Sequence, residues 1–284
     1  MSHADDKTRS IEVDIDIEAP AKEVWKALTD PVELARWFPL DAEVEPGPGG
    51  TIRLRWGPEI DGRCGIRVWE PERRLQMGWF EPEAAVEDAH DTVFYKDRDA
   101  RRRLAVDFFL RSESGRTILR LVHSGFSTDA SWDEEFDAHR RGWTLELRSL
   151  RHYLENHRGQ DRTVAWIRKA IDRPKAAAWT TLLSGKRGVD PQGVLAGLAT
   201  GVRYALTTAH GERWEGEVIL NLPPTEFAAT IDNLGRSLVR FGIETHMGKP
   251  EAWAWLSAWG GPAHAREFRE KWTAALDTLF DARH

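Results

Sequence analysis

Cysteine is almost absent from this 284-residue chain: Cys64 is the only one, which excludes an internal disulfide. No group of cysteines and histidines has the spacing of a zinc site. The sequence also lacks a phosphate-binding loop, a nucleophile elbow and a zinc-protease motif. We therefore predict no metal and no cofactor and assign no catalytic residue, although a missing motif does not exclude an enzyme.

Long hydrophobic runs and an excess of positive charge are missing too. The N-terminal residues are polar and acidic, so no signal peptide is expected. The longest weakly polar stretch, residues 188–206, contains Asp190 and Arg203, and we expect no membrane span. The 40 basic and 46 acidic residues give a formal charge of −6, which argues against a nucleic-acid partner. These absences predict a cytoplasmic protein.

Aromatic residues, by contrast, are plentiful. The chain has 14 tryptophans and 11 phenylalanines, with 41% hydrophobic and 30% charged residues, a profile typical of folded globular proteins. Its length favours about two domains, each able to bury its own core.

An internal repeat supports that division. Residues 17–28 recur as residues 171–182, with matching Ile, Pro, Trp and Leu at an offset of 154 (171 − 17). Two further matches follow in the same order: residues 115–121 with 235–241, and Trp143, Leu147 and Leu150 with Trp272, Leu276 and Leu279. The offsets drift, unlike those of a solenoid. We predict two tandem domains, at residues 8–158 and 163–283.

The pattern of the first half predicts a sheet and a long helix. Strict alternation over 11–17 indicates a strand, Pro20 begins a helix that runs to Leu28, and a second short helix carries Trp37 and Phe38. Strands are expected at 51–56, 63–69, 74–80, 104–110 and 117–123, with a charged, exposed excursion over 81–103 and a helix over 133–156. This order indicates an α+β fold in which a curved antiparallel sheet grips its C-terminal helix.

The second half repeats the order in shortened form. We expect a strand at 163–171, a helix at 174–183, a further helix after Asp190-Pro191, strands at 202–207, 215–222, 227–231 and 237–245, and a closing helix at 264–280. Glycines at 193, 197 and 201 are interpreted as allowing close helix packing. The short gap between Ile231 and Gly235 predicts that this copy has lost a strand and its excursion.

Several short motifs in the first half occur in the order of a known family. They include Ile17-x-Ala-Pro20, Val24-Trp25-x-Ala-Leu28-Thr-Asp30-Pro31, Arg36-Trp37-Phe38 and Gly142-Trp143-x-x-x-Leu-x-x-Leu150. Over about residues 10–155 the chain resembles bacterial homologues of the heat-shock protein ATPase activator, within the START-like (SRPBCC, helix-grip) superfamily. The resemblance implies a cavity between sheet and long helix that accepts apolar ligands. It does not imply one reaction.

Alternation within the strands selects the side chains that would line this cavity. Ten residues are candidates for ligand binding: Trp37, Trp56, Met77, Trp79, Phe108, Leu121, His123, Arg140, Trp143 and Leu147. An aromatic lining with few polar groups is typical of small-molecule sites. The alternative is that these side chains simply fill the core.

Two of the candidates are polar. His123 points inward from its strand, where it could orient a ligand carbonyl or transfer a proton, or could be a hydrogen-bonded core histidine. Arg140 could hold a ligand carboxylate, or could extend to solvent.

Three functions are compatible with these features. The leading hypothesis is that the first domain binds a small hydrophobic or amphipathic molecule. One alternative is a cyclase- or hydrolase-type enzyme that acts in the same cavity, with His123 and Arg140 or Glu146 as its polar groups. Another is a protein-interaction or chaperone-cofactor module, in which Trp253, Trp255 and Trp259 mark a partner surface rather than pack inside the protein.

Overall fold

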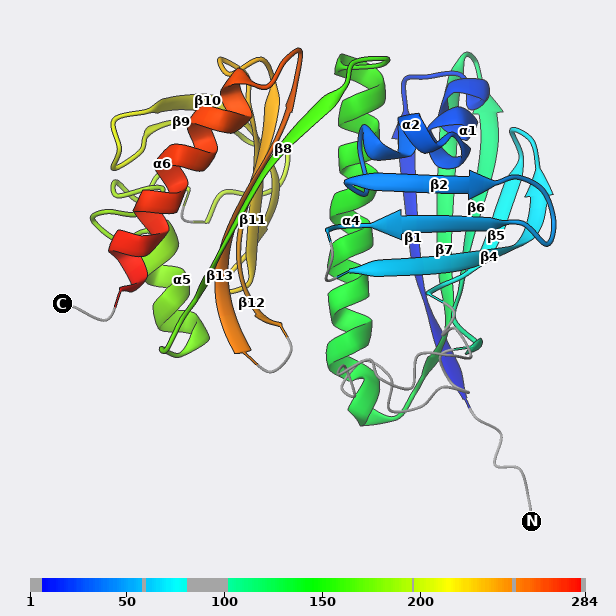
Figure 1. Cartoon of the computed structure of the whole chain (residues 1–284), viewed down its shortest axis with the longest axis horizontal. Helices are drawn as coiled ribbons and strands as arrows, with labels where there is room; N and C mark the ends of the chain where they lie inside the picture. Colours follow the sequence, from blue (N-terminus) through cyan, green and yellow to red (C-terminus); the bar gives the residue numbers. More distant parts are fainter. Residues whose placement is uncertain (1–6, 58–59, 81–101, 196, 247–248, 282–284) are drawn as a thin grey trace. The chain divides into compact units, whose positions relative to one another are not determined.

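The protein folds into two compact units that divide between Gly159 and Gln160. The computed structural model (Figure 1) describes residues 7–57, 60–80, 102–195, 197–246 and 249–281. Most of the predicted charged excursion, residues 81–101, lies outside the described residues. Each described unit is an antiparallel sheet that packs on its own long C-terminal helix, which confirms the predicted α+β helix-grip class.

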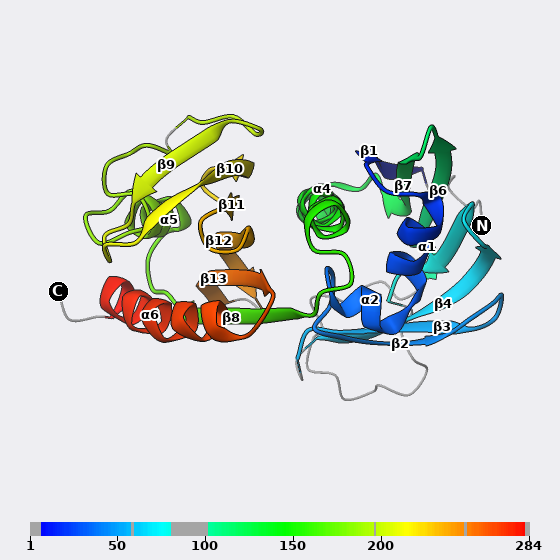
Figure 2. The same ribbon diagram turned by 90° about the horizontal axis from the view of Figure 1, so that it is seen from above.

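The first unit contains a seven-stranded sheet in the order β1-β7-β6-β5-β4-β3-β2. Its strands are β1 (Thr8–Ile17), β2 (Asp41–Glu45), β3 (Thr51–Arg55), β4 (Asp61–Glu70), β5 (Arg74–Gly78), β6 (Ala105–Glu113) and β7 (Arg116–Ser127). Its helices are α1 (Ala21–Thr29), α2 (Pro31–Ala35), the short 3-10 turn η1 (Ala130–Trp132) and α4 (Asp133–Asn156). Figure 2, seen along α4, shows the sheet curving around one side of this helix.

Alternation in β1 places its two faces in different environments. Ile11 and Ile17 are buried, whereas Glu12 and Asp16 lie on the exposed face and pair with arginines of β7. The apolar face of β1 packs on α4. Because β1 and β7 are antiparallel neighbours, the register of β1 also fixes which side chains of β7 point towards α4.

The short helix α2 ends earlier than the sequence pattern predicts. The Asp30 carboxylate accepts hydrogen bonds from the backbone N–H groups of Val32 and Glu33, at 2.9 and 3.1 Å, and so caps its N-terminus. The helix ends at Ala35. Trp37 and Phe38, expected within this helix, therefore follow it.

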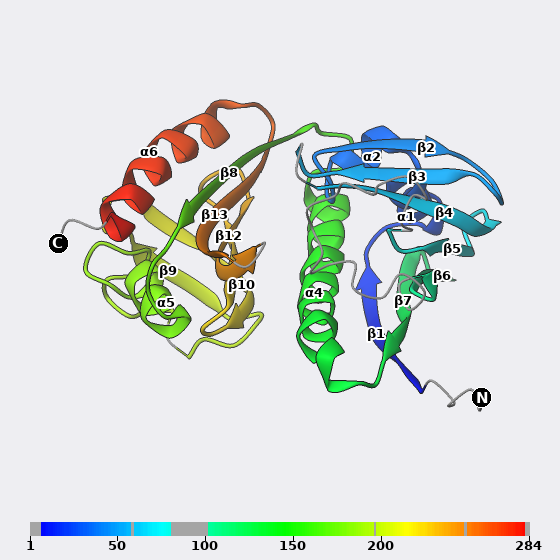
Figure 3. The same ribbon diagram turned by 60° about the horizontal axis from the view of Figure 1, so that its bottom comes forward.

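The second unit contains a six-stranded sheet in the order β8-β13-β12-β11-β10-β9. Its elements are β8 (Arg162–Ala170), α5 (Lys175–Leu183), β9 (Arg203–Thr207), β10 (Arg213–Leu222), β11 (Glu226–Ile231), β12 (Ser237–His246), β13 (Lys249–Trp259) and α6 (Ala263–Phe280). The helix α6 packs on β8 and β13, as Figure 3 shows.

The helix predicted after Asp190-Pro191 is not present among the described residues 184–195 and 197–201, which form turns and bends. The reason is visible at the glycines. Gly193, Gly197 and Gly201 have φ values of +74°, +76° and +83°, a left-handed conformation that ends helices. The four-residue spacing thus belongs to successive turns, and the interpretation as a helix-packing stripe was wrong.

Two strands, β2 and β13, were not predicted from the sequence pattern. In β13 small and large apolar residues alternate, as in Ala252-Trp253-Ala254-Trp255, so no polar face marks the strand. Its alanines join the core of the second unit, and its tryptophans therefore belong to the opposite face of the sheet. Trp253, Trp255 and Trp259 are all buried.

Strand order corrects one part of the repeat. Residues 115–121 lie at the start of β7, next to the first strand of their sheet, whereas residues 235–241 lead into β12, which is two places from β8. The two segments are therefore not equivalent. Both are a glycine turn followed by an alternating strand, a pattern that many hairpins share. The strand that the second sheet lacks corresponds to β2. It does not correspond to β5 or β6, the strands on either side of the charged excursion in the first unit.

Candidate ligand-binding site

Aromatic side chains from β7, from α4 and from Trp79, the residue that follows β5, meet between the sheet and the long helix of the first unit. Trp79, His123, Phe126 and Trp143 are buried. The His123 ring lies 5.4 Å from the Trp79 ring, 4.6 Å from Phe126 and 6.1 Å from Trp143, measured between centroids. Trp79 and Trp143 are 5.0 Å apart. These four residues form the inner layer of the candidate site.

A second set of rings packs over the inner layer and is partly exposed. Trp56, Phe80, Phe136 and His139 make up this outer layer. Phe80 is 4.7 Å from Trp79, and Phe136 is 5.3 Å from Phe126. The site is thus graded, from half-exposed rings on the outside to fully buried ones around His123.

His123 is positioned by the alternation of β7. With Leu119 and Leu121 it forms the buried face of that strand. The indole N–H of Trp143 donates a hydrogen bond of 2.9 Å to its Nδ1. Its Nε2 is buried and forms no hydrogen bond with any described residue. Burial, followed by the neighbouring His139, holds the pKa of His123 well below its ordinary value, so the ring is neutral at neutral pH.

His139 contributes a second imidazole from α4, with its ring centroid 5.1 Å from that of His123. The indole N–H of Trp79 donates to His139 Nε2 at 3.1 Å, which leaves the proton of the neutral ring on Nδ1. That Nδ1 lies 2.9 Å from the backbone carbonyl of Glu135, to which it donates. His139 and Trp79 therefore hold each other in place.

Six of the ten predicted residues take part in one network of ring contacts: Trp37, Trp56, Trp79, Phe108, His123 and Trp143. Phe38 connects them, since its ring lies 5.0 Å from both Trp37 and Trp56 and 5.6 Å from Trp143. Met77, Leu121 and Leu147 are buried. In the sheet, Met77 pairs with Val106 and Leu121 pairs with Phe108. Whether these residues contact a ligand remains a prediction.

Arg140 does not join the network. Its side chain is 61% exposed and pairs with Asp137 at 3.0 Å, so it cannot hold a ligand beside His123. The inward position is taken by His139 instead. Neighbouring helical residues differ by about 100° in direction, and the spacing Phe136–His139–Trp143 follows the helical period as well as Phe136–Arg140–Trp143 does. Comparing the two stripes could have identified His139 from the sequence.

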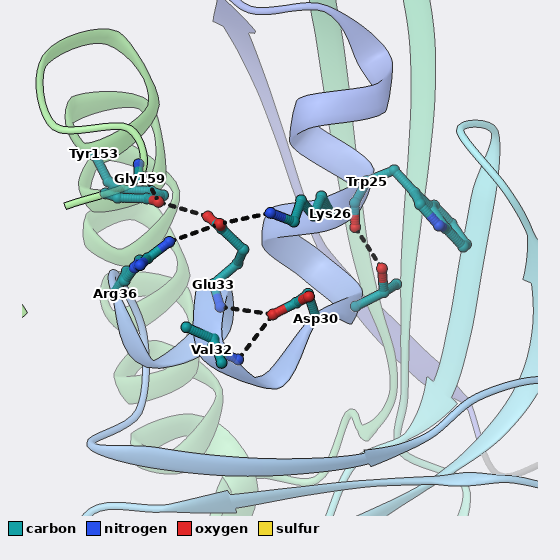
Figure 4. Close-up of polar contacts among 9 residues, drawn as sticks. Trp25, Lys26, Asp30, Val32, Glu33, Arg36, Tyr153 and Gly159 are labelled. Atoms are coloured by element: carbon teal, nitrogen blue, oxygen red, sulfur yellow. Dashed lines mark hydrogen bonds and ion pairs between the residues drawn. The ribbon is translucent and has the colours of Figure 1, made fainter. Parts of the chain in front are cut away.

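A polar cluster fixes α2 to the end of α4 (Figure 4). The buried Glu33 carboxylate accepts hydrogen bonds from Tyr153 Oη at 2.5 Å, Arg36 at 2.8 Å and Lys26 at 3.0 Å. Tyr153 Oη in turn accepts from the Gly159 backbone N–H at 2.9 Å. This arrangement, here called the Glu33 clasp, fastens the loop that carries Trp37 and Phe38 to the long helix.

Opposing effects set the pKa values in the clasp. Burial raises the pKa of Glu33, but the hydrogen bonds from Tyr153 and Lys26 outweigh it, and the net pKa is below the ordinary value. Burial, together with the hydrogen bond to Glu33, raises the pKa of Tyr153 to about 12. The clasp thus holds an ionised carboxylate and a neutral phenol at neutral pH.

The described residues bring together no group of three or more His, Cys, Asp or Glu side chains that could hold a metal ion. No described helix is long and apolar enough to cross a membrane.

Solved structures resemble the chain over one unit or over both. The Aha1 dimer from Colwellia psychrerythraea shares 21% identity, covering 53% of this chain and 99% of its own, with a TM-score of 0.42. DynU16, a putative protein of the dynemicin biosynthetic locus, shares 19% identity over 97% of this chain and 98% of its own, with a TM-score of 0.41. The di-domain ARO/CYC protein BexL from the BE-7585A biosynthetic pathway shares 17% identity over 97% of this chain and 100% of its own, with a TM-score of 0.40.

No curated protein matches the sequence. A family model does match the first unit, over residues 18–155, which include α1, α2, the sheet from β2 to β7 and nearly all of α4. Residues 18–155, and with them the first unit, therefore belong to the family of activator of Hsp90 ATPase homolog 1-like proteins.

Proposed function

We propose that the first unit binds a small apolar or amphipathic molecule among the aromatic side chains that face α4. The observation that supports this proposal is the buried Nε2 of His123, which lacks a partner among the described residues although aromatic rings surround it. Buried polar groups are nearly always hydrogen-bonded. Small-molecule sites commonly have a mostly aromatic and apolar lining with a few polar atoms that point into the site.

The aromatic layers would supply most of the affinity. Burial of apolar surface contributes about 25 cal/mol per Å², so two or three rings against a ligand suffice for binding without dedicated chemistry. The outer layer gives a route inward, because Trp56, Phe80 and Phe136 are only partly buried and can be displaced more easily than the inner rings. The ligand would then lie against Trp79 and Trp143.

Binding of an environment-sensitive naphthalene dye to the delipidated full-length protein tests the proposal. We expect saturable binding, weakened about tenfold or more by Trp79→Leu, because this change removes a wall of the inner layer. Trp166→Leu, a half-buried position of the second unit, is the matched control and should leave the affinity unchanged. Absence of saturable binding, or equal loss in both variants, would count against the proposal. Circular dichroism of each variant verifies the fold.

The pairing of His123 with His139 favours a second candidate, a cyclase- or hydrolase-type enzyme in the same place. Two imidazoles with ring centroids 5.1 Å apart could move a proton on a bound substrate. Hydrolysis of p-nitrophenyl esters with increasing acyl length is a direct assay. A rate that His123→Ala leaves unchanged would set the enzyme reading aside.

A further inference from the structure

The hydrogen bond between Trp143 and His123 determines which polar group a ligand would meet. An indole nitrogen can only donate, so His123 Nδ1 is the acceptor and carries no proton. The neutral ring must then carry its one proton on Nε2. That N–H is buried and faces no acceptor in the part of the chain that the structure describes. The inner layer therefore offers a ligand one hydrogen-bond donor.

This donor carries no charge. Protonation of His123 would bring an N–H at Nδ1 against the N–H of Trp143, and burial opposes the charge as well. His139, the titratable group facing it from α4, is engaged through Nε2 by Trp79. Arg9 is stacked on Phe136 in the outer layer, and its charge is paired with Asp133.

A buried carboxylate in a ligand would lack a counter-charge under these conditions. Desolvation of an unpaired anion is costly, whereas a neutral carbonyl oxygen needs only one donor. The surrounding groups are flat rings, with Trp79 and Trp143 tilted by 59° to each other across a 5.0 Å centroid separation. Flat aromatic ligands pack best against such rings in stacked or edge-to-face contacts.

We infer that the ligand of the first unit is a neutral aromatic ketone or quinone whose carbonyl oxygen accepts a hydrogen bond from Nε2–H of His123. This inference rests on the proposed binding function and specifies its chemistry. His123 acts as the polar anchor, and Trp143 acts through it as a positioning residue that fixes the tautomer.

Three dyes of one shape test the inference on the full-length protein. They are 6-propionyl-2-(dimethylamino)naphthalene, its 6-propyl analogue without the carbonyl, and 6-(dimethylamino)-2-naphthoic acid. We expect the ketone to bind about tenfold more tightly than the propyl analogue, as relief of one buried unpaired donor should give, and the acid to bind more weakly than the ketone. Equal affinity for the ketone and the propyl analogue would overturn the inference while leaving the binding function intact. Failure of all three dyes to bind would refute the binding function itself.

The variant His123→Leu removes the donor and keeps an apolar side chain of similar size. It should bind the propyl analogue as the wild type does and lose the preference for the ketone. Retention of the full preference would contradict the inference.

A second readout does not depend on that variant folding. Histidine labelled with ¹⁵N distinguishes the two neutral tautomers by NMR, and the wild type should show His123 as the Nε2–H form. Addition of the ketone dye should shift this N–H resonance, while the propyl analogue should not. An Nδ1–H tautomer, or identical shifts with both dyes, would overturn the inference.

Discussion

The two units share an arrangement of strands and long helix but differ in the side chains between them. The strands β7 and β13 occupy the same place, each beside the first strand of its sheet. Ile11 pairs with His123 in one sheet, and Ala165 pairs with Leu256 in the other. Ile11 and Ala165 are separated by 154 residues, the offset of the repeat. Leu256 is therefore the counterpart of His123.

The same registers relate the helix contacts. Phe108 lies opposite Leu121 in the first sheet, and Phe241 lies opposite Ala254 in the second. Each phenylalanine meets the tryptophan of its long helix, Phe108 with Trp143 at 5.9 Å and Phe241 with Trp272 at 4.7 Å between centroids.

What differs is the partner of the indole N–H. Trp143 donates to His123, whereas Trp272 Nε1 is buried and unpartnered among the described residues. The second unit has kept the apolar contacts of the first and lost its polar pair. A buried unpaired donor costs about 1–3 kcal/mol, so the second unit tolerates a defect that the first avoids. The His123–Trp143 pair, and not the aromatic side chains around it, is therefore what distinguishes the centre of the first unit from that of the second.

The strongest test of this difference between the units is to remove the indole N–H of each long helix. Trp143→Phe leaves His123 Nδ1 unpaired and should lower the free energy of unfolding by about 3 kcal/mol. Trp272→Phe removes a donor that is already unpaired, so it should cost about 1 kcal/mol, from lost packing alone. Urea unfolding of both variants measures the difference. Equal losses would mean that the hydrogen bond to His123 contributes nothing.

The Glu33 clasp gives a second contrast, because no counterpart of α2 follows α5 among the described residues of the second unit. Tyr153→Phe deletes a hydrogen bond to an ionised carboxylate and should cost about 2 kcal/mol of unfolding free energy. Tyr204→Phe in the second unit deletes a bond of 2.7 Å to the neutral Thr230 carbonyl and should cost about 1 kcal/mol. Thermal unfolding of the two variants gives the comparison, and a larger loss in Tyr204→Phe would contradict it.

Acid should destabilise the first unit before the second. The folded-state pKa of His123 is depressed, so its contribution is present above the ordinary histidine pKa of about 6.5 and is lost as pH falls below that value. Between pH 6.5 and 5.5 the loss approaches about 1 kcal/mol, since the unfolded chain takes up a proton that the folded chain does not. Glu33, whose pKa is also lowered, adds a further loss only as pH falls below about 4.5.

Urea unfolding at a series of pH values measures this dependence, and His123→Leu is its control. The variant should lose the slope between pH 6.5 and 5.5 and keep the slope at lower pH. An unchanged slope in the variant would show that another histidine is responsible.

Much of this fold could be predicted because local patterns determine it. Alternation in residues 117–123 correctly identified Leu119, Leu121 and His123 as one buried face, since a strand period of two leaves little ambiguity. The repeat at Trp25 and Trp179 identified the second unit. Such features depend on neighbours in sequence.

The remaining features depend on contacts between distant residues. The tautomer of His123 is set by Trp143 from another element, and that of His139 by Trp79, which is 60 residues away in the sequence. The strand β13 was missed because both of its faces are apolar, and the turns at Gly193 and Gly197 because spacing alone does not report φ. Three-dimensional pairing decides each of these cases.

The smallest expected effect comes from restoring the lost partner in the second unit. Leu256→His places an imidazole where Trp272 should be able to donate to it, as Trp143 does to His123. The new hydrogen bond should offset most of the cost of burying a polar ring, so the change in unfolding free energy should stay below about 1 kcal/mol. Leu206→His is the comparison at another buried core position of the same unit, where burial of the polar ring should cost about 3 kcal/mol. If Leu256→His is as damaging as Leu206→His, the two strands do not hold equivalent positions. Suppose instead that Leu256→His is tolerated and that the ¹⁵N spectrum gains an Nε2–H histidine. The second unit then retains the geometry of the proposed binding site, and one side chain distinguishes its centre from that of the first unit.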